Sequence, residues 1–485
     1  MNTPIELNTD QQSAMAEIKP FLTNPSQQAF VLCGSAGTGK TTLVARILEL
    51  AYSLELQSML VAPTGRAARI LQGKLDHMLP AQLKGIKVST LHGAIYYQSK
   101  MTIDESRHED GLSAMQMDFS LKKQGNAFDL LIVDEASMVG DAAMHQKTLR
   151  FGSSRLLTDL VGYVNFLYQE GMVSKPIKLL FVGDLAQLPP VGSEQSPALS
   201  PSYLDKHFGI QAQRYELTQV MRQAEGSHIL PLANAIRKTI FQPIDQPLKI
   251  KYNETDVQQT DFYSAVKLIA DNVRQNRSSV AVVYLNSIAL EYNLGVRKLL
   301  WGNGYCITHD DDHLLVTRNS PSLGLSNGDL VKVHSVLTSQ LIETVRLPNG
   351  HFVNLKFREV RLTPNTHGSD RDSETIQCTI LENLLHSSNS DLKAEEQDAL
   401  YELVKQRNPY LDPNSSAFEE AMRDDPYYNA LQVRFGYALT CHKAQGGEWQ
   451  EVIVDPMGVQ LGSQQGKRWL YTAVTRASKS LLLVQ

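Results

Sequence analysis

A glycine-rich segment near the N-terminus constrains the fold of this chain more than any other feature. Residues 34–41 read GSAGTGKT, which matches the pattern GxxxxGK[ST] at every fixed position. The apolar run 29–33 before it predicts a buried strand, and apolar residues recur at helical spacing in 42–48 after it. A strand, a glycine-rich turn and a helix N-terminus together direct backbone N–H groups at a polyphosphate. The segment therefore predicts an α/β domain that binds a nucleoside triphosphate.

The chemistry of this loop assigns roles to individual residues. Lys40 would reach the terminal phosphates, and the hydroxyl of Thr41 would bind Mg²⁺. Gln11 could read adenine, because an amide offers both a donor and an acceptor, although a solvated glutamine at a helix start is the simpler interpretation. The ATP-binding residues predicted from this region are Gln11, Gly34, Ser35, Ala36, Gly37, Thr38, Gly39, Lys40, Thr41 and Thr42.

Two further apolar runs end at polar side chains suited to hydrolysis. The run 130–133 leads to Asp134, which would hold Mg²⁺ through water, and to Glu135, which would polarise the attacking water. The run 178–182 leads to Gln187, which would contact the γ-phosphate and sense hydrolysis. The paired carboxylates favour a hydrolase over a protein that only senses nucleotide.

Length and composition limit the class of protein. The 485 residues are enough for about three folding units. The four cysteines, Cys33, Cys306, Cys378 and Cys441, form no CxxC pair, which argues against a zinc site or a disulfide framework. No signal sequence is visible, and no apolar run approaches the roughly 20 residues of a membrane span. We therefore expect a reduced, cytoplasmic protein without a membrane segment.

The negative charge of the chain is concentrated in one part. The formal net charge is −5, but residues 370–425 contain 14 acidic and 5 basic side chains. The remainder is therefore mildly basic, and local basic channels can serve nucleic acid without an extreme overall charge. Within the acidic part, residues 391–425 read partly as helix, with charges that we expect to be mostly solvated and that could also dock a protein partner.

The order of patterns predicts two tandem α/β domains, each with an insertion. Residues 306–425 contain alternating strands and turn sequences, which indicate a small β-barrel. The α/β pattern returns at 433–439. The expected first core domain comprises 1–92 and 127–214, with a small insertion at 93–126, and the second comprises 215–305 and 426–485, with the β-rich insertion at 306–425.

Motifs from one end of the chain to the other resemble those of superfamily 1 helicases, in the branch that includes the phage Dda and bacterial RecD helicases. The resemblance covers nearly the whole chain except 93–126 and 306–425. It implies two RecA-like parallel-sheet domains in tandem, with an SH3-like barrel inserted in the second. The motifs are GSAGTGKT (34–41), APTGRAA (62–68), STLH (89–92), VDEASM (133–138), GDLAQLPPV (183–191), LTCHKAQGGEW (439–449) and YTAVTRA (471–477).

The resemblance also implies roles for matching residues. Arg222 and Arg476 correspond to the arginines that the second core domain contributes to the γ-phosphate, where a guanidinium stabilises the transferred phosphoryl group. Glu448 corresponds to a residue near the ribose, and the match supports Gln11 as the adenine reader. The positions that correspond to strand-binding residues are Pro63, Thr64, Thr90, His92, Thr440 and His442.

Some of these assignments have simpler alternatives. Thr90 and Thr440 could be hydroxyls that satisfy backbone groups at strand ends. Aromatic residues could stack on bases, although single aromatics in apolar surroundings more often belong to a core. The aromatic candidates are Tyr96, Tyr97, Trp301 and Trp449.

The activity implied by the resemblance is Mg²⁺- and ATP-dependent unwinding of DNA, with 5′-to-3′ movement on a single strand. Such an enzyme would serve DNA repair, recombination or replication. Residues 93–126 would form the pin that splits the duplex, and the barrel would lie beside the strand. An RNA-directed helicase and a nucleotide switch that does not translocate are the alternatives, and the sequence indicates no oligomeric state.

Overall fold

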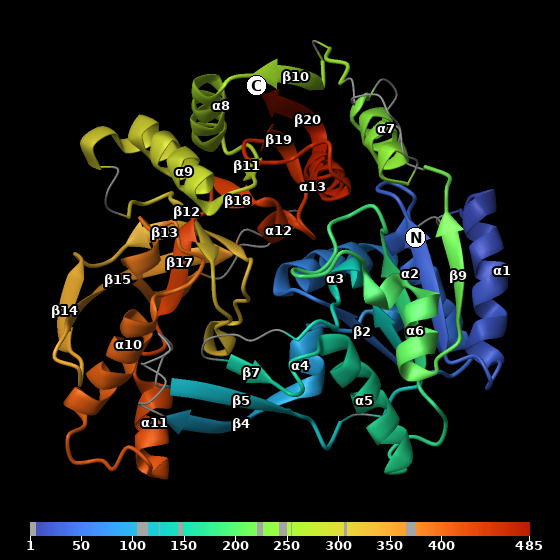
Figure 1. Cartoon of the computed structure of the whole chain (residues 1–485), viewed down its shortest axis with the longest axis horizontal. Coiled ribbons are helices and arrows are strands. Elements are labelled where there is room, and N and C mark those ends of the chain that lie inside the picture. Colours follow the sequence, from blue (N-terminus) through green and yellow to red (C-terminus); the bar gives the residue numbers. More distant parts are fainter. Residues whose placement is uncertain are drawn as a thin grey trace.

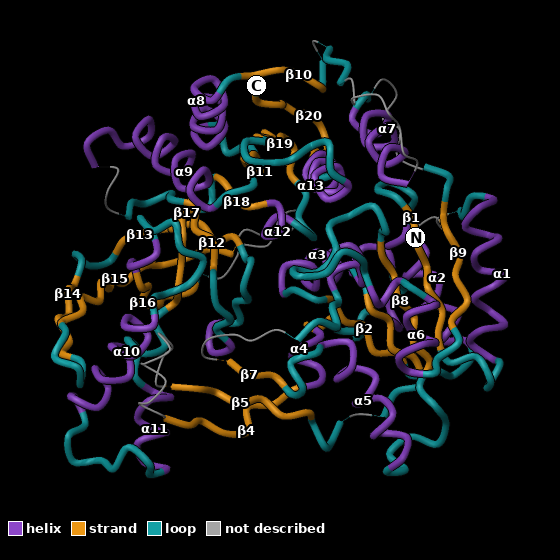
Figure 2. The backbone as a smooth tube through the Cα atoms, in the orientation of Figure 1, coloured by secondary structure: helices purple, strands orange, loops and turns teal. Residues whose placement is uncertain are grey.

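The strands of the described part of the chain form two parallel sheets, one mixed six-stranded sheet and one small three-stranded sheet (Figure 1). Helices and strands alternate through both parallel domains, as the tube in Figure 2 shows. The computed structural model describes residues 6–103, 115–125, 127–143, 149–220, 227–241, 250–253, 255–304, 308–364 and 375–485.

The first parallel sheet is built around the phosphate loop, residues 34–41. Its strand order is β3-β2-β6-β8-β1-β9, and each neighbouring pair is parallel. β1 (Ala29–Gly34) leads into the loop and is buried along its whole length, as expected for a parallel strand covered on both faces. The last strand continues to Leu217, so the expected domain boundary at 214 falls inside it. The other strands are β2 (Ser58–Ala62), β3 (Val88–Thr90), β6 (Leu130–Val133), β8 (Lys178–Gly183) and β9 (Ala212–Leu217).

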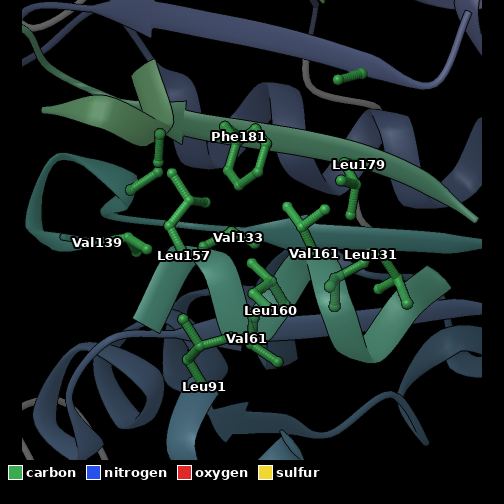
Figure 3. Close-up of a cluster of buried hydrophobic side chains, with 14 of the residues drawn as sticks. Val61, Leu91, Leu131, Val133, Val139, Leu157, Leu160, Val161, Leu179 and Phe181 are labelled. Carbon is green, nitrogen blue, oxygen red and sulfur yellow. The ribbon is translucent and has the colours of Figure 1, made fainter. Parts of the chain in front are cut away.

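Alternate side chains of these strands form two apolar cores. Val133 and Phe181 pack with residues of α5 on one face (Figure 3). Phe30 and Leu32 point to the opposite face and pack with residues of α1, α2 and α3. The sheet is thereby fixed between helices, and its strand ends are held in place. These helices are α1 (Thr9–Thr23), α2 (Lys40–Ser53), α3 (Gly65–Met78) and α5 (Leu156–Gln169).

The second parallel sheet has the order β10-β20-β19-β11-β18. Helices α8 and α9 pack on one face, and α7 and α13 pack on the other. The expected pair of parallel α/β core domains is therefore confirmed. The elements are α7 (Ile229–Phe241), β10 (Val257–Thr260), α8 (Phe262–Arg274), β11 (Ser279–Val283), α9 (Asn286–Trp301), β18 (Ala438–Thr440), β19 (Trp449–Asp455), α13 (Gln464–Val474) and β20 (Ala477–Val484).

The β-rich insertion forms a mixed sheet of order β13-β12-β17-β16-β15-β14. β13 also pairs with β15, so five strands form a closed circuit of pairings. One of the five, β17, follows the expected end of the insertion at 425. The run 433–439 therefore contributes to two sheets, first to β17 and then to β18. The strands are β12 (His313–Val316), β13 (Leu330–Val336), β14 (Leu341–Arg346), β15 (Phe352–Pro364), β16 (Ile376–Leu381) and β17 (Leu431–Phe435).

A small three-stranded sheet occupies the insertion of the first domain. β4 (Tyr96–Ile103) and β5 (Met115–Leu121) pair antiparallel, and β7 (Leu149–Phe151) adds to β5 in parallel. β7 corrects the expected limits of this insertion, because it comes from the range 127–214 that the sequence places in the core domain.

The far end of the small sheet meets the acidic segment (Figure 1). Met117 of β5 packs against Tyr401 of α10 (Ala394–Arg407) and Phe418 of α11 (Ser416–Asp424). The segment expected to present a solvated face therefore uses apolar side chains of these two helices for an internal contact.

The remaining helices of the described ranges are short, and none of the helices there is long and apolar enough to cross a membrane. They are α4 (Leu91–Ile95), α6 (Pro201–Phe208) and α12 (Cys441–Ala444).

Candidate functional site

The phosphate loop joins β1 to α2 through two glycines in the left-handed region. Gly37 has φ of +81° and Gly39 has φ of +78°, values that a residue with a Cβ adopts rarely. Lys40 begins α2, and its ammonium donates to the carbonyl oxygens of Gly34 at 2.7 Å and Ser35 at 3.0 Å. The loop therefore has the expected backbone turn, and its lysine lies against the loop backbone.

Gln11 supports this loop from α1. Its side chain is 1% exposed and donates from Nε2 to the carbonyl of Thr38 at 3.1 Å. Its Oε1 accepts from the amide of Asn8 at 3.1 Å, as part of a capping box at the start of α1. Both ends of the amide therefore already contact protein groups.

Two carboxylates follow β6, as expected. Desolvation and the neighbouring Glu135 raise the pKa of Asp134 above its ordinary value. Glu135 has a left-handed φ of +48°, and its Oε2 is buried without a hydrogen-bond partner in the described ranges. Thr41 of α2 adds a hydroxyl. A desolvated carboxylate and a hydroxyl are hard oxygen ligands that suit Mg²⁺ when phosphate oxygens complete its coordination.

The segment after β8 is bonded to the second domain. The amide of Leu188 donates to Thr472 Oγ1 at 2.9 Å, and its carbonyl accepts from Gln445 Nε2 at 3.1 Å. The Leu188 side chain is buried in an apolar cluster of the second domain. Gln187 is also buried, and no hydrogen bond reaches its Oε1 within the described residues. The predicted phosphate sensor therefore lies on a segment that both domains hold.

Arg476 is anchored within its own domain. Its guanidinium donates to the carbonyls of Thr472 at 2.9 Å and Gly447 at 3.2 Å, and to Thr475 Oγ1 at 3.1 Å. These bonds use three of the five guanidinium N–H groups, which leaves two beyond them for the predicted contact with a γ-phosphate. Arg222, the other predicted arginine, lies outside the described residues.

Glu448 follows the Gly446-Gly447 pair of the second domain and lies 3.4 Å from the ammonium of Lys74 in α3. Lys74 also acts electrostatically on Asp134. The structure thus brings Glu448 to the side of the first domain that carries the predicted metal-binding carboxylate.

The predicted strand-binding residues of the first domain lie at two adjacent strand ends. β2 and β3 pair so that Ala62 is opposite Thr90, which places Pro63 and Thr64 beside Thr90 and His92. The Thr64 and Thr90 hydroxyls accept backbone amides at the starts of α3 and α4. The simpler interpretation of Thr90, a hydroxyl that satisfies backbone, therefore describes one of its contacts.

The remaining predicted strand-binding residues belong to the second domain. Thr440 ends β18, and the exposed His442 lies in α12. The first domain approaches this region, because a Cβ on Gly446 would lie 3.0 Å from Ala67 Cβ in α3. The two sets of residues therefore lie on elements that converge at one junction between the domains.

His92 and three of the four aromatic candidates have partners within the protein. The His92 and Phe151 rings pack edge to face, and burial lowers the pKa of His92. The Tyr96 hydroxyl donates to Asp159 at 2.6 Å. Trp449 is buried under a guanidinium, whereas Tyr97 is exposed. Trp301 stacks on an imidazole.

Sequence reasoning missed several residues that join the domains at this site, among them Tyr471 and Arg237. The Tyr471 hydroxyl donates to Asp184 Oδ2 at 2.6 Å and accepts from the amide of Ala36 at 3.2 Å. The Arg237 guanidinium of α7 pairs with Glu216, at the end of the first sheet. A signal for the tyrosine was available, because it lies in the same motif as Arg476 and shares a helix with Thr472.

Two family models match parts of the chain. Residues 22–193 match the AAA domain, and residues 435–484 match the UvrD-like helicase C-terminal domain. These ranges contain the phosphate loop, the paired carboxylates, Gln187 and Arg476.

The chain is similar to several proteins along most or part of its length. An uncharacterized protein of Acanthamoeba polyphaga mimivirus is 23% identical over 525 residues, which cover 98% of this chain and 99% of that protein. The ATP-dependent RecD2 DNA helicase of Deinococcus radiodurans is 32% identical over 206 residues, which cover 42% of this chain but 21% of that protein. A crystal structure of a Pif1 helicase from Bacteroides with ADP-AlF3 and ssDNA has 18% identity and a TM-score of 0.42, covering 99% of this chain and 92% of that one.

Proposed function

We propose that this chain, which belongs to the superfamily 1 helicases and hydrolyses ATP, moves 5′-to-3′ along single-stranded DNA and separates duplex strands. The observation that carries the proposal is the junction between two parallel-sheet domains. On one side lie the phosphate loop and the paired carboxylates, and on the other lies the helix that precedes Arg476. Segment 184–188 is hydrogen-bonded across this junction, so closure and hydrolysis can be coupled.

The chain's own residues would divide the work of hydrolysis. The loop amides and Lys40 would hold the phosphates, and Thr41 and Asp134 would hold Mg²⁺. When bound, Mg²⁺ supplies positive charge to the phosphate oxygens. Glu135 would orient and polarise the attacking water, while Gln187, Arg222 and Arg476 would respond to the γ-phosphate.

Gln11 and Glu448 would complete the nucleotide site. The Gln11 amide retains a second N–H and a second lone pair beyond its bonds to Asn8 and Thr38, and these would read adenine. Glu448 would lie near the ribose. Gln11→Ala should then reduce the preference for ATP over GTP; an equal rise of KM for both nucleotides would limit Gln11 to supporting the loop.

Single-stranded DNA would cross both domains at the strand ends. Pro63, Thr64, Thr90 and His92 would bind it in the first domain, and Thr440 and His442 in the second. Backbone and stacking contacts of this kind have little sequence preference. Such a motor would serve DNA repair, recombination or replication.

The two insertions would act on the duplex and on the strand. We assign the small sheet of residues 93–126, extended by β7, as the pin, and the circuit of β12, β13, β15, β16 and β17 as an SH3-like barrel beside the strand. The contact of Met117 with α10 and α11 would brace the pin. We place the domain boundaries after Leu217 and after Phe435, and the exposed acidic side chains of 391–425 could still dock a protein partner.

The deciding experiment combines steady-state ATPase with strand separation. We expect Mg²⁺-dependent hydrolysis that single-stranded DNA stimulates, and unwinding of duplexes that carry a 5′ tail. Unwinding only from a 3′ tail would retain the helicase and reverse the direction. Stimulation by RNA alone would indicate an RNA-directed helicase, and hydrolysis without response to either nucleic acid would indicate a switch.

A further inference from the structure

A single hydroxyl of the second domain contacts both phosphate-facing segments of the first. Tyr471 lies in α13 with 0% of its surface exposed. Its oxygen accepts the amide of Ala36 in the phosphate loop at 3.2 Å, and its proton is donated to Asp184 Oδ2 at 2.6 Å. Burial and the nearby Asp184 raise the pKa of Tyr471 well above its ordinary value, so the hydroxyl keeps the proton that it donates.

The same helix holds the rest of segment 184–188. Thr472 accepts the amide of Leu188 at 2.9 Å, and the guanidinium of Arg468 donates to the carbonyls of Leu185 and Gln187. Asp184 is fixed at its other oxygen by the amide of Ala186 at 2.9 Å. A movement of α13 therefore moves the backbone of Gln187, and Tyr471 connects that movement to the phosphate loop.

The contact with Ala36 puts the tyrosine in competition with phosphate. Amides of a phosphate loop are donors for phosphate oxygens. A charged phosphate oxygen accepts a stronger hydrogen bond than a neutral phenol does. A phosphate that reaches the Ala36 amide must therefore displace the Tyr471 oxygen, while the bond to Asp184 can remain.

We propose that Tyr471 is a positioning residue that couples occupancy of the phosphate loop to segment 184–188, by exchanging its bond to Ala36 for phosphate while it keeps Asp184. The proposal rests on the proposed function, since it assigns a residue to the same nucleotide site. This role differs from those of the arginines. The bond of Tyr471 to Ala36 opposes phosphate binding, whereas its bond to Asp184 transmits the effect of phosphate binding to segment 184–188.

The test is Tyr471→Phe, which removes the hydroxyl and keeps the ring. In this variant no tyrosine oxygen competes with phosphate for the Ala36 amide. Kd for a fluorescent ADP and for a non-hydrolysable ATP analogue should therefore fall about two- to tenfold, the range of a net hydrogen bond. The kcat of DNA-stimulated hydrolysis should fall together with KM, because Asp184 loses its link to α13. A tyrosine that only stabilises the fold would leave Kd unchanged, and one that supports the nucleotide-binding shape of the loop would raise it.

Tyr292→Phe is the matched control. Tyr292 is also 0% exposed and donates to an aspartate, Asp455, at 3.0 Å, but both residues lie within the second domain. It should lose similar stability in urea unfolding and leave the nucleotide Kd unchanged. An unchanged or raised Kd in Tyr471→Phe, or an equal fall in Tyr292→Phe, would overturn the proposal. A wild-type protein that binds nucleotide but does not unwind DNA would reject the proposed function, while the ratio of Kd values would still decide the role of Tyr471.

Discussion

The guanidinium carbon of Arg66 lies 4.1 Å from the centre of the Trp449 ring, although the two residues belong to different core domains. Both side chains are buried. Desolvation, with a smaller contribution from Arg476, lowers the pKa of Arg66 to about 10, while Asp329 acts in the opposite direction. The domains therefore meet through a stacked cation that is held away from water, an arrangement worth about 2 kcal/mol or more in desolvated sites.

Gly447 makes room for this stack. A Cβ at this position would lie 2.7 Å from the Arg66 guanidinium and 2.6 Å from the Trp449 ring. Gly447→Ala should therefore displace the guanidinium and lower the free energy of unfolding by about 1–3 kcal/mol, as overpacking does. Urea unfolding measures the change. Gly462→Ala is the control, because no atom lies within 4 Å of its added Cβ, and an equal loss there would contradict the explanation.

Glu135→Gln should separate nucleotide binding from hydrolysis. The substitution keeps the shape of the side chain and removes the charge that would polarise water, so kcat should fall about 10²- to 10⁴-fold. Binding of a fluorescent ADP should change little. The control is Glu49→Gln, which breaks a surface ion pair with Arg46. Glu49 lies about 14 Å along the axis of α2 from Lys40. Retention of near-normal hydrolysis in Glu135→Gln would remove this residue from the mechanism.

Asp256 should make stability depend on acidic pH. Burial alone would raise its pKa, but hydrogen bonds from the His228 amide, Ser227 and Asn253 lower the pKa of Asp256 to about 2. A depressed carboxyl pKa stabilises the fold above the unfolded value near 4, and this contribution disappears as pH falls toward 2.

Asp256→Asn should therefore lower the free energy of unfolding by about 1–2 kcal/mol at pH 7, with a smaller difference from wild type below pH ~4. Urea unfolding at several pH values measures this difference. The exposed Asp205→Asn should show neither effect. A difference at Asp256 that stays constant down to pH ~2 would mean that the carboxylate charge is not responsible.

Met117→Asp should uncouple unwinding from hydrolysis if the small sheet is the pin. Met117 packs among Tyr401, Val404 and Phe418, where an unpaired carboxylate is costly. Loss of this contact should reduce unwinding by roughly tenfold or more, the change that about 1.4 kcal/mol produces, while DNA-stimulated ATPase stays near wild type. Gln98→Asp, on an exposed position of the same sheet, should leave both activities intact. Parallel loss of ATPase in the Met117 variant would argue against the pin assignment.

The positions of the catalytic candidates were predictable because their signals are local. An apolar run, a polar strand end and a helix start fall within a few residues around Lys40, and the carboxylates of Asp134 and Glu135 end another such run. The structure places Lys40 at the start of α2, after the loop that follows β1, and the two carboxylates directly after β6, as the pattern indicates. Hydrogen bonds among neighbours in sequence fix such segments, so a short window contains the information.

Strand partners were not predictable in the same way, because pairing joins distant residues. β7 joins the small sheet through Leu149 opposite Met117, and β17 joins the mixed sheet through Phe435 opposite Leu314. Neither pairing changes the local spacing of apolar residues, so this spacing does not reveal which strands pair. Tyr471 was missed for a related reason, since a buried aromatic in a helix reads as core until its hydroxyl partners are known.

The short connection between β17 and β18 limits how the insertion can be deleted or transferred to a related protein. Gly436 and Tyr437 alone separate the last strand of the closed circuit from the strand that ends at Thr440. Excision of 306–425 would remove β12 and β16, the two strands that pair with Leu431–Phe435, and would leave this strand as an unpaired edge prone to aggregation. A workable graft between related motors must exchange residues 306–435 as one unit.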